Sequence, residues 1–182
     1  MLKGYYIMAA KPVRVKHITN KVRFSFVSVF EPAETLNGTL KYSMMVLIPK
    51  SDKDGVARFN KAFEEAKQSN AAFFGGSVPK LLKGGLRDGD AEKDDPEFAG
   101  HYFFNAYANL DRKPGVVDAE VNPILDPSEL YSGCYGRVSI DLYPYDTSGA
   151  KGIAIGLNNV QKLEDGERLG GASATAATDF AV

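Results

Sequence analysis

Aromatic and cationic side chains share one face of a strand predicted over residues 133–145. Because side chains alternate across a strand, the odd positions share a face: Tyr135, Arg137, Ser139, Asp141, Tyr143 and Tyr145. The even positions form an ordinary core face of Cys134, Val138, Ile140 and Leu142. Exposed aromatic rings beside a cation suit stacking on nucleic-acid bases. The same side chains also suit a strand covered by a loop or a second sheet, so the segment alone leaves both interpretations open.

A second predicted strand, residues 101–110, has a similar face. Phe103 and Tyr107 alternate there with groups that can form hydrogen bonds. Arg112 and Lys113 follow at the strand end, where they could contact a phosphate. This pattern again favours a surface for a polymer that carries both bases and negative charge.

Few residues could support catalysis or bind a metal. Outside the carboxylates, the candidates are His17, His101 and Cys134. The acidic run at 88–97 has carboxylates at alternating positions, as a calcium-binding loop does. Lys93 stands where such a loop needs glycine, however, and Ala99 stands where it needs glutamate. We therefore expect no enzymatic activity, no metal site and no cofactor.

Composition places the chain among single globular domains. It has 182 residues, of which 44% are hydrophobic and 25% charged, enough to build a core. The net charge of −1 conceals a gradient: residues 1–50 carry +6 (eight Lys or Arg against two Glu), and residues 164–182 carry −3 (four acidic residues against one Arg). This division indicates an anionic partner or a tail that competes with one. Without a long apolar run or a leader pattern, we expect no membrane contact and a cytoplasmic location.

Hydrophobic periodicity predicts two strands, a helix, a long loop and then three or four more strands. The first strand, residues 22–30, places Phe24 and Phe26 on one face and is expected to be largely buried. A helix is expected over about 52–69. The glycine- and lysine-containing loop at about 70–100 is either a basic flap or an ordinary surface excursion. Mostly antiparallel strands with one helix are typical of a small barrel.

Three segments are expected along the chain. Residues 1–7 precede Met8-Ala9-Ala10-Lys11, a natural bacterial start, so we expect them to be a start-site extension. Residues 8–163 form the domain. Residues 164–182 are expected to be a flexible, acidic-ended tail, because a segment so low in apolar content cannot order itself.

Three blocks of sequence resemble a known family: ELYSGCYGRVSIDLYPYD, KGIAIGLNNVQKLEDGE and the upstream VRFSFVSVFEP. The chain resembles, from Val13 to Gly171, a phage family similar to the helix-destabilising single-stranded DNA-binding proteins. The resemblance implies an OB-like barrel that coats single-stranded DNA during phage replication or recombination. Such proteins often end in a dense acidic run capped by an aromatic residue, and this chain departs from that pattern, because only Asp179 and Phe180 resemble the tip. These two residues are the expected contacts with phage or host replication or recombination proteins.

On this model, aromatic residues stack on bases and basic residues contact phosphates, so binding weakens as salt rises. The expected stacking residues are Phe103, Tyr107, Tyr135, Tyr143 and Tyr145. The expected phosphate contacts are Lys41, Lys80, Lys83, Arg87, Arg112, Lys113, Arg137 and Lys151.

The alternative is a phage structural or assembly protein whose tyrosine-rich faces form a protein interface, because tyrosine is also common at interface cores. Binding to RNA is left open, since a stacking platform does not read the 2′-hydroxyl. A homodimer through exposed strand edges is left open as well.

Overall fold

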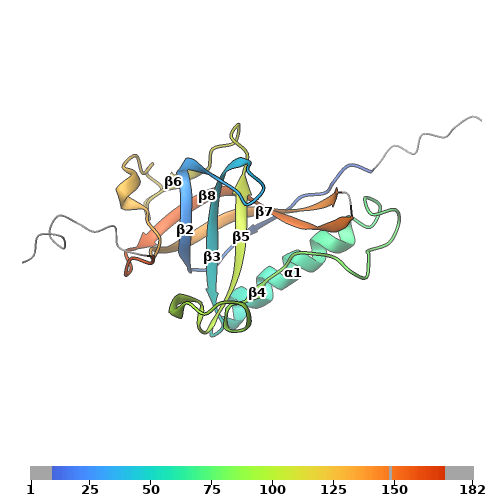
Figure 1. Ribbon diagram of the computed structural model, residues 1–182, viewed down its shortest axis with the longest axis horizontal. Helices are drawn as coiled ribbons and strands as arrows, with labels where there is room; N and C mark the ends of the chain where they lie inside the picture. The colour runs from blue at the N-terminus through green and yellow to red at the C-terminus, as the bar shows by residue number, and fades with distance from the viewer. Residues whose placement is uncertain (1–9, 148, 171–182) are drawn as a thin grey trace, which may run out of the picture.

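Five strands close into a ring in the computed structural model, which describes residues 10–147 and 149–170. The ring strands are β2 (Val22–Glu34), β3 (Leu40–Pro49), β5 (His101–Ala108), β8 (Ala150–Glu164) and β7 (Tyr135–Thr147). Each strand pairs with the next in that order, and β7 returns to β2. All pairs are antiparallel except β5 with β8 (Figure 1). A five-stranded Greek-key ring is the architecture of an OB-type barrel, and the predicted fold class is confirmed.

Three short strands extend the ring at its edges. β1 (Val15–Ile18) pairs with β7 beyond the point where β2 leaves it, and β6 (Gly115–Val117) pairs with β8 beyond β5. β4 (Arg87–Asp88) pairs with β5. The long strands β7 and β8 therefore pair with three strands each: β7 with β1, β2 and β8, and β8 with β5, β6 and β7. A short 3-10 turn, η2 (Pro127–Glu129), precedes β7.

The core lies inside the ring, and its pattern on β7 is the one that alternation predicts. Val138, Ile140 and Leu142 are buried, whereas Arg137 is exposed and Tyr143 half-buried on the opposite face. The other strands contribute buried residues to the same cluster, among them Phe24, Met44, Val46, Phe104, Leu157 and Val160. The outer face of β7 is thus free of core packing and available for contacts.

The main helix, α1 (Lys53–Ser69), packs against the ring beside β1 and the β7–β8 hairpin (Figure 1). Asp52 caps it, because its carboxylate accepts a hydrogen bond from the Gly55 amide at 2.9 Å. Phe59 is fully buried, and its ring centroid lies 5.1 Å from that of Phe104. The helix predicted over 52–69 is confirmed. Within the described residues, no helix is long and apolar enough to cross a membrane.

His17 lies buried between β7 and α1, with its ring edge-on to Phe59 at 5.8 Å. Burial, and secondarily the positive charge of Arg58, lower the pKa of His17 below its ordinary 6.5. As the pH falls through 6.5, the unfolded chain gains a proton that the folded protein does not yet accept. The free energy of unfolding is therefore expected to decrease between about pH 7.5 and about pH 5.5. Urea unfolding at both pH values should show a smaller decrease for His17→Leu; an equal decrease would contradict the assignment to His17.

A β-bulge in β2 overturns one sequence expectation. Alternation predicts that Phe26 lies beside Phe24 in the core, but Phe26 is 63% exposed. Ser25 is opposite Met45 and Ser28 is opposite Ser43, so two residues of β2, Phe26 and Val27, face a single residue of β3. The extra residue turns Phe26 outward, and Val29 then takes the next core position.

The predicted loop at 70–100 is partly folded. After β4 come α2 (Gly89–Glu92) and the 3-10 turn η1 (Pro96–Phe98). The Lys50 ammonium lies 2.6 Å from an Asp88 oxygen and 2.7 Å from an Asp90 oxygen, and these hydrogen bonds lower the pKa of both carboxyls. The segment covers part of the outer face of β3 and β5 with a small second cluster of buried residues: Met45, Leu47, Phe98 and Phe103.

The predicted tail begins as a packed segment. Strand β8 continues to Glu164, one residue past the expected boundary. The Tyr131 hydroxyl then lies 3.1 Å from an Asp165 oxygen, and Leu169 packs against the second cluster. The predicted start extension (residues 1–7) and the tail tip, Asp179 and Phe180, lie outside the described residues.

Candidate nucleic-acid interface

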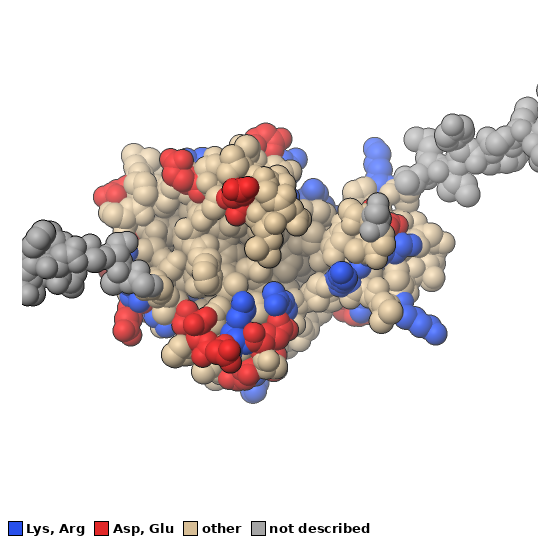
Figure 2. Space-filling view, in the orientation of Figure 1, with Lys and Arg blue, Asp and Glu red and all other residues tan. Residues whose placement is uncertain are grey.

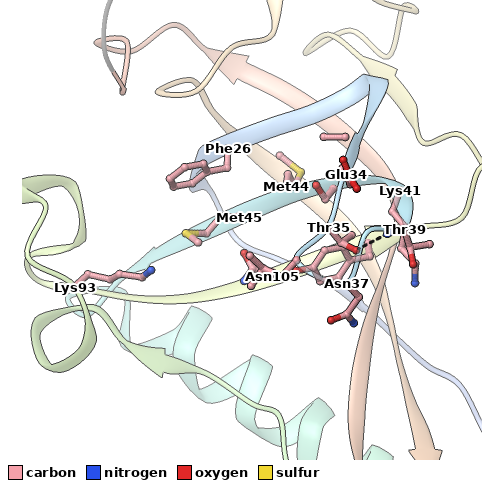
Figure 3. A pocket seen from close by; sticks show the side chains of 14 residues that line it. Phe26, Glu34, Thr35, Asn37, Thr39, Lys41, Met44, Met45, Lys93 and Asn105 are labelled. Atoms are coloured by element: carbon pink, nitrogen blue, oxygen red, sulfur yellow. Dashed lines mark hydrogen bonds between the residues drawn. The ribbon is translucent and has the colours of Figure 1, made fainter. Parts of the chain in front are cut away.

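A groove of about 650 Å³ crosses the outer face of β3 and β5 (Figure 3). We call it the main groove. Phe26, Met45 and Lys93 lie at one end, and Lys41 lies at the other end with the β2–β3 loop, residues 35–39. Asn105 and Tyr107 of β5 also line the groove. Cations thus lie at both ends of a groove that contains aromatic and small polar groups between them.

Two smaller hollows continue from the Lys41 end of the main groove. The first, about 240 Å³, shares Lys41 and Tyr107 with the main groove and is also lined by Arg14 and Tyr143. The second, about 420 Å³, shares Arg112 with the first. It is also lined by Lys16, Lys113 and Asp141. The three hollows therefore form one continuous surface over β3, β5, β8, β7 and β1, which we call the binding path.

Tyr143 and Arg14 form a stacked pair in the middle of the binding path. The Arg14 guanidinium carbon lies 4.3 Å from the centre of the Tyr143 ring, and a guanidinium nitrogen lies 3.7 Å from an Asp141 oxygen. Beneath the ring is Gly156 of β8, where a Cβ atom would lie 3.2 Å from the ring. Glycine at this position lets the tyrosine lie close to the sheet with the arginine above it.

Charge along the binding path is positive but not uniform. Its cations are Lys93, Lys41, Arg14, Arg112, Lys16 and Lys113, and its carboxylates are Glu34, Asp111 and Asp141. Figure 2 shows few charged side chains over the centre of the face formed by β2, β3 and β5. Lys and Arg gather with Asp and Glu near β4, and more Lys and Arg lie toward the β7–β8 hairpin. An uncharged floor between cations suits a ligand whose flat groups alternate with anionic groups.

The structure brings five of the predicted site residues together on the binding path. These are Lys41, Tyr107, Arg112, Lys113 and Tyr143. Tyr107 is 40% exposed, so its ring is accessible from the main groove.

Three other predicted residues surround a separate hollow of about 460 Å³ at the tip of the β7–β8 hairpin: Lys80, Lys83 and Lys151. Backbone hydrogen bonds hold this arrangement. The Lys83 amide donates to the Lys151 carbonyl at 3.0 Å, and the Ile153 amide donates to the Lys83 carbonyl at 2.9 Å. We call this hollow the hairpin hollow.

The prediction that Phe103 stacks on a base is wrong for this structure, because the side chain is 0% exposed. Phe103 does lie on the outer face of β5, but Phe98 of η1 covers it with ring centroids 5.3 Å apart. Arg87 lies above the same ring at 4.7 Å and forms an ion pair with Glu92 at 2.6 Å. Phe103 and Arg87, which were both predicted to contact DNA, therefore take part in packing the 87–100 segment against β5.

The other predicted residues lie on the outer face of β7 but do not line the hollows. Tyr135 is flanked by Lys21 and Arg23, whose charged groups lie 5.7 and 5.3 Å from its ring centre. Arg137 donates a hydrogen bond of 2.7 Å to the Gln161 side chain. Tyr145 is half-buried against Gly152.

Sequence reasoning missed four residues of the binding path. Phe26 was missed because the bulge turns its side chain outward, and alternation alone does not reveal a bulge. Lys93 lies in an acidic run, so its charge drew attention only as a departure from a calcium loop. Arg14 and Lys16 belong to the basic first 50 residues, and this charge was the one signal that could have found them.

Comparison with known proteins identifies related chains. Residues 15–182 match the family described as Enterobacter phage Enc34, ssDNA-binding protein. Protein p50 of Acyrthosiphon pisum secondary endosymbiont phage 1 is 30% identical over 169 residues, which cover 88% of this chain and 90% of that protein.

Two solved structures share the fold. One is the single-stranded DNA-binding protein from bacteriophage Enc34 in complex with ssDNA, with a TM-score of 0.71 and 24% identity over 86% of this chain and 90% of that chain. The other is gp2.5, a single-stranded DNA-binding protein encoded by bacteriophage T7. Its TM-score is 0.56, with 19% identity over 92% of this chain and 95% of that chain.

Proposed function

Because the chain belongs to the family of the Enterobacter phage Enc34 ssDNA-binding protein, we propose that it binds single-stranded DNA along the binding path without sequence preference. The observation that carries this proposal is the continuity of the three hollows, which share Lys41, Tyr107 and Arg112 at their junctions. In OB-type barrels, the face of the second and third strands and the loop before them bind oligonucleotides. β3 and β5 are the second and third strands of this ring, and the main groove lies on them.

In the proposed complex, stacking on bases and ion pairing with phosphates both contribute to the affinity. We expect one base to stack on the exposed Tyr107 ring and another on the Arg14 guanidinium plane that the Tyr143 ring supports from below, because every sequence supplies bases that can stack. Lys41, Arg112 and Arg14 are placed to contact phosphates, so affinity falls as salt rises. Binding of the single strand but not the duplex shifts DNA melting toward open strands by mass action. This function needs no cofactor, no metal and no enzymatic step.

The proposed function is tested by fluorescence anisotropy of a labelled dT oligonucleotide and of a matching duplex, each at low and moderate salt. We expect tight binding of the single strand that weakens with salt, and much weaker binding of the duplex. Equal binding of both forms would contradict the proposal. Binding to neither form would favour the alternative, a phage assembly protein that uses the tyrosine-rich face as a protein interface.

The hairpin hollow is proposed to extend the contact with longer strands. Lys80→Glu/Lys83→Glu is expected to weaken binding to dT of about 20 nucleotides by about tenfold at low salt. Binding to dT of about 8 nucleotides, within the range of about 4 to 16 that one OB fold covers, should change little. The control, Lys53→Glu/Lys61→Glu, makes the same charge change on exposed positions of α1. Equal losses for both lengths, or for both variants, would contradict the extension.

The biological setting follows from the proposed binding. Exposed single strands arise when phage DNA is replicated or recombined, so we place the protein there, in the cytoplasm of the bacterial host. Contacts of the tail tip with replication proteins and a homodimer stay predictions.

A further inference from the structure

Phe26 has a backbone conformation that a bulky side chain rarely adopts. Its φ is +46°, in the left-handed region that favours glycine. It is also the first of the two bulge residues opposite Met44. A bulge with this conformation normally has glycine at that position. The chain thus has a phenylalanine where backbone geometry alone would select glycine.

Burial does not compensate for this strain. The side chain is 63% exposed, so most of the apolar ring remains in water. A single exposed phenylalanine is common on protein surfaces and needs no explanation. An exposed phenylalanine on a strained backbone is different, because a glycine at that position would both relieve the backbone strain and remove the exposed ring. Strain of this kind is concentrated at functional sites.

The bulge places the Phe26 ring at one end of the main groove. Figure 3 shows Phe26 with Met45 below it and Lys93 nearby, at the end of the main groove away from the β2–β3 loop. Without the bulge, alternation would continue from Phe24 and turn position 26 toward the core. An aromatic face bordering a groove, with an ammonium group nearby, is complementary to an unpaired base and its phosphate.

We propose that Phe26 is a preformed stacking platform for an unpaired base at the Lys93 end of the main groove, and that the strained bulge serves to present it. This inference rests on the proposed function. It adds a third aromatic contact to Tyr107 and Tyr143 and extends the bound strand across the whole main groove. Because the bulge fixes the ring before DNA arrives, less conformational freedom is lost on binding.

The test is Phe26→Gly, in which stability and affinity are expected to change in opposite directions. Glycine relieves the strain, so the Tm should stay equal or rise. Affinity for a labelled dT oligonucleotide should fall about 5- to 150-fold, the range expected for loss of one base stack. Phe26→Tyr keeps the ring and should bind like the parent protein. Phe26→Leu keeps apolar bulk without a ring and should bind weakly.

Val121 provides a matched control. It is the other non-glycine residue with positive φ among the described residues, at +67°, and it is 67% exposed outside the binding path. Val121→Gly should raise the Tm without changing affinity. Unchanged affinity of Phe26→Gly, or a lowered Tm, would overturn the inference and leave the proposed function intact. Failure of the parent protein itself to bind dT would instead reject the proposed function, and the stacking role with it.

Discussion

Replacing Lys41 and Arg112 together by glutamate is expected to weaken binding to a dT oligonucleotide by at least about a hundredfold at low salt. These two cations lie where the hollows of the binding path meet, so a strand that follows the path must pass both. Each charge-assisted contact contributes about 1.5 to 3 kcal/mol, and a carboxylate in its place also repels the phosphate. The loss is measured by anisotropy in a salt titration.

The salt dependence separates lost contacts from general repulsion. Two fewer phosphate contacts should reduce the slope of log K against log salt by about 1.4. The variant Lys53→Glu/Lys61→Glu changes the net charge equally on the outer surface of α1. It should retain most of the affinity and the parent slope. If both double variants lose the same affinity, the strand does not follow the proposed path.

Removal of two rings, in Tyr107→Ala/Tyr143→Ala, is expected to weaken binding by at least about thirtyfold. Stacking contributes about 1 to 3 kcal/mol per base, and the two rings lie in neighbouring hollows. The loss should persist at high salt, because stacking, unlike phosphate contact, releases few counterions. Anisotropy at low and high salt distinguishes this loss from that of the charge variants.

Two controls define the aromatic contribution. Tyr107→Phe/Tyr143→Phe keeps both rings and should bind within about threefold of the parent, since only the hydroxyl groups are lost. Tyr135→Ala removes a ring from the same face of β7 but outside the hollows. A loss for Tyr135→Ala as large as that for Tyr143→Ala would place the strand along β7 rather than across the barrel.

Local pattern was sufficient to predict the long strands and the main helix, but not the short strands β1 and β4. Alternation on β7 separates Ile140 and Leu142 from Tyr143 because this strand has one face in the core. The helix has a capping aspartate and a periodic apolar stripe, and both are properties of neighbouring residues. The order of the strands in the ring could not be predicted from local pattern, because pairing between residues far apart in the sequence determines it.

The binding path was only partly predictable for the same reason. Tyr107 and Tyr143 could be recognised as members of outward faces, but their proximity depends on the parallel pairing of β5 with β8. Phe103 has the same pattern as Tyr107, yet a segment that folds back over β5 covers it. The position of Phe26 depends on one extra residue in β2. Coverage and bulges arise from tertiary contacts, which alternation does not encode.

Photo-cross-linking tests the central claim most directly. A dT oligonucleotide carrying 5-bromodeoxyuridine at defined positions is bound to the full chain, irradiated and digested, and the cross-linked peptides are identified by mass spectrometry. We predict cross-links at Phe26, Tyr107 and Tyr143, in an order along the oligonucleotide that follows the binding path. Cross-links confined to Tyr135 and its neighbours, or to α1, would contradict the binding path.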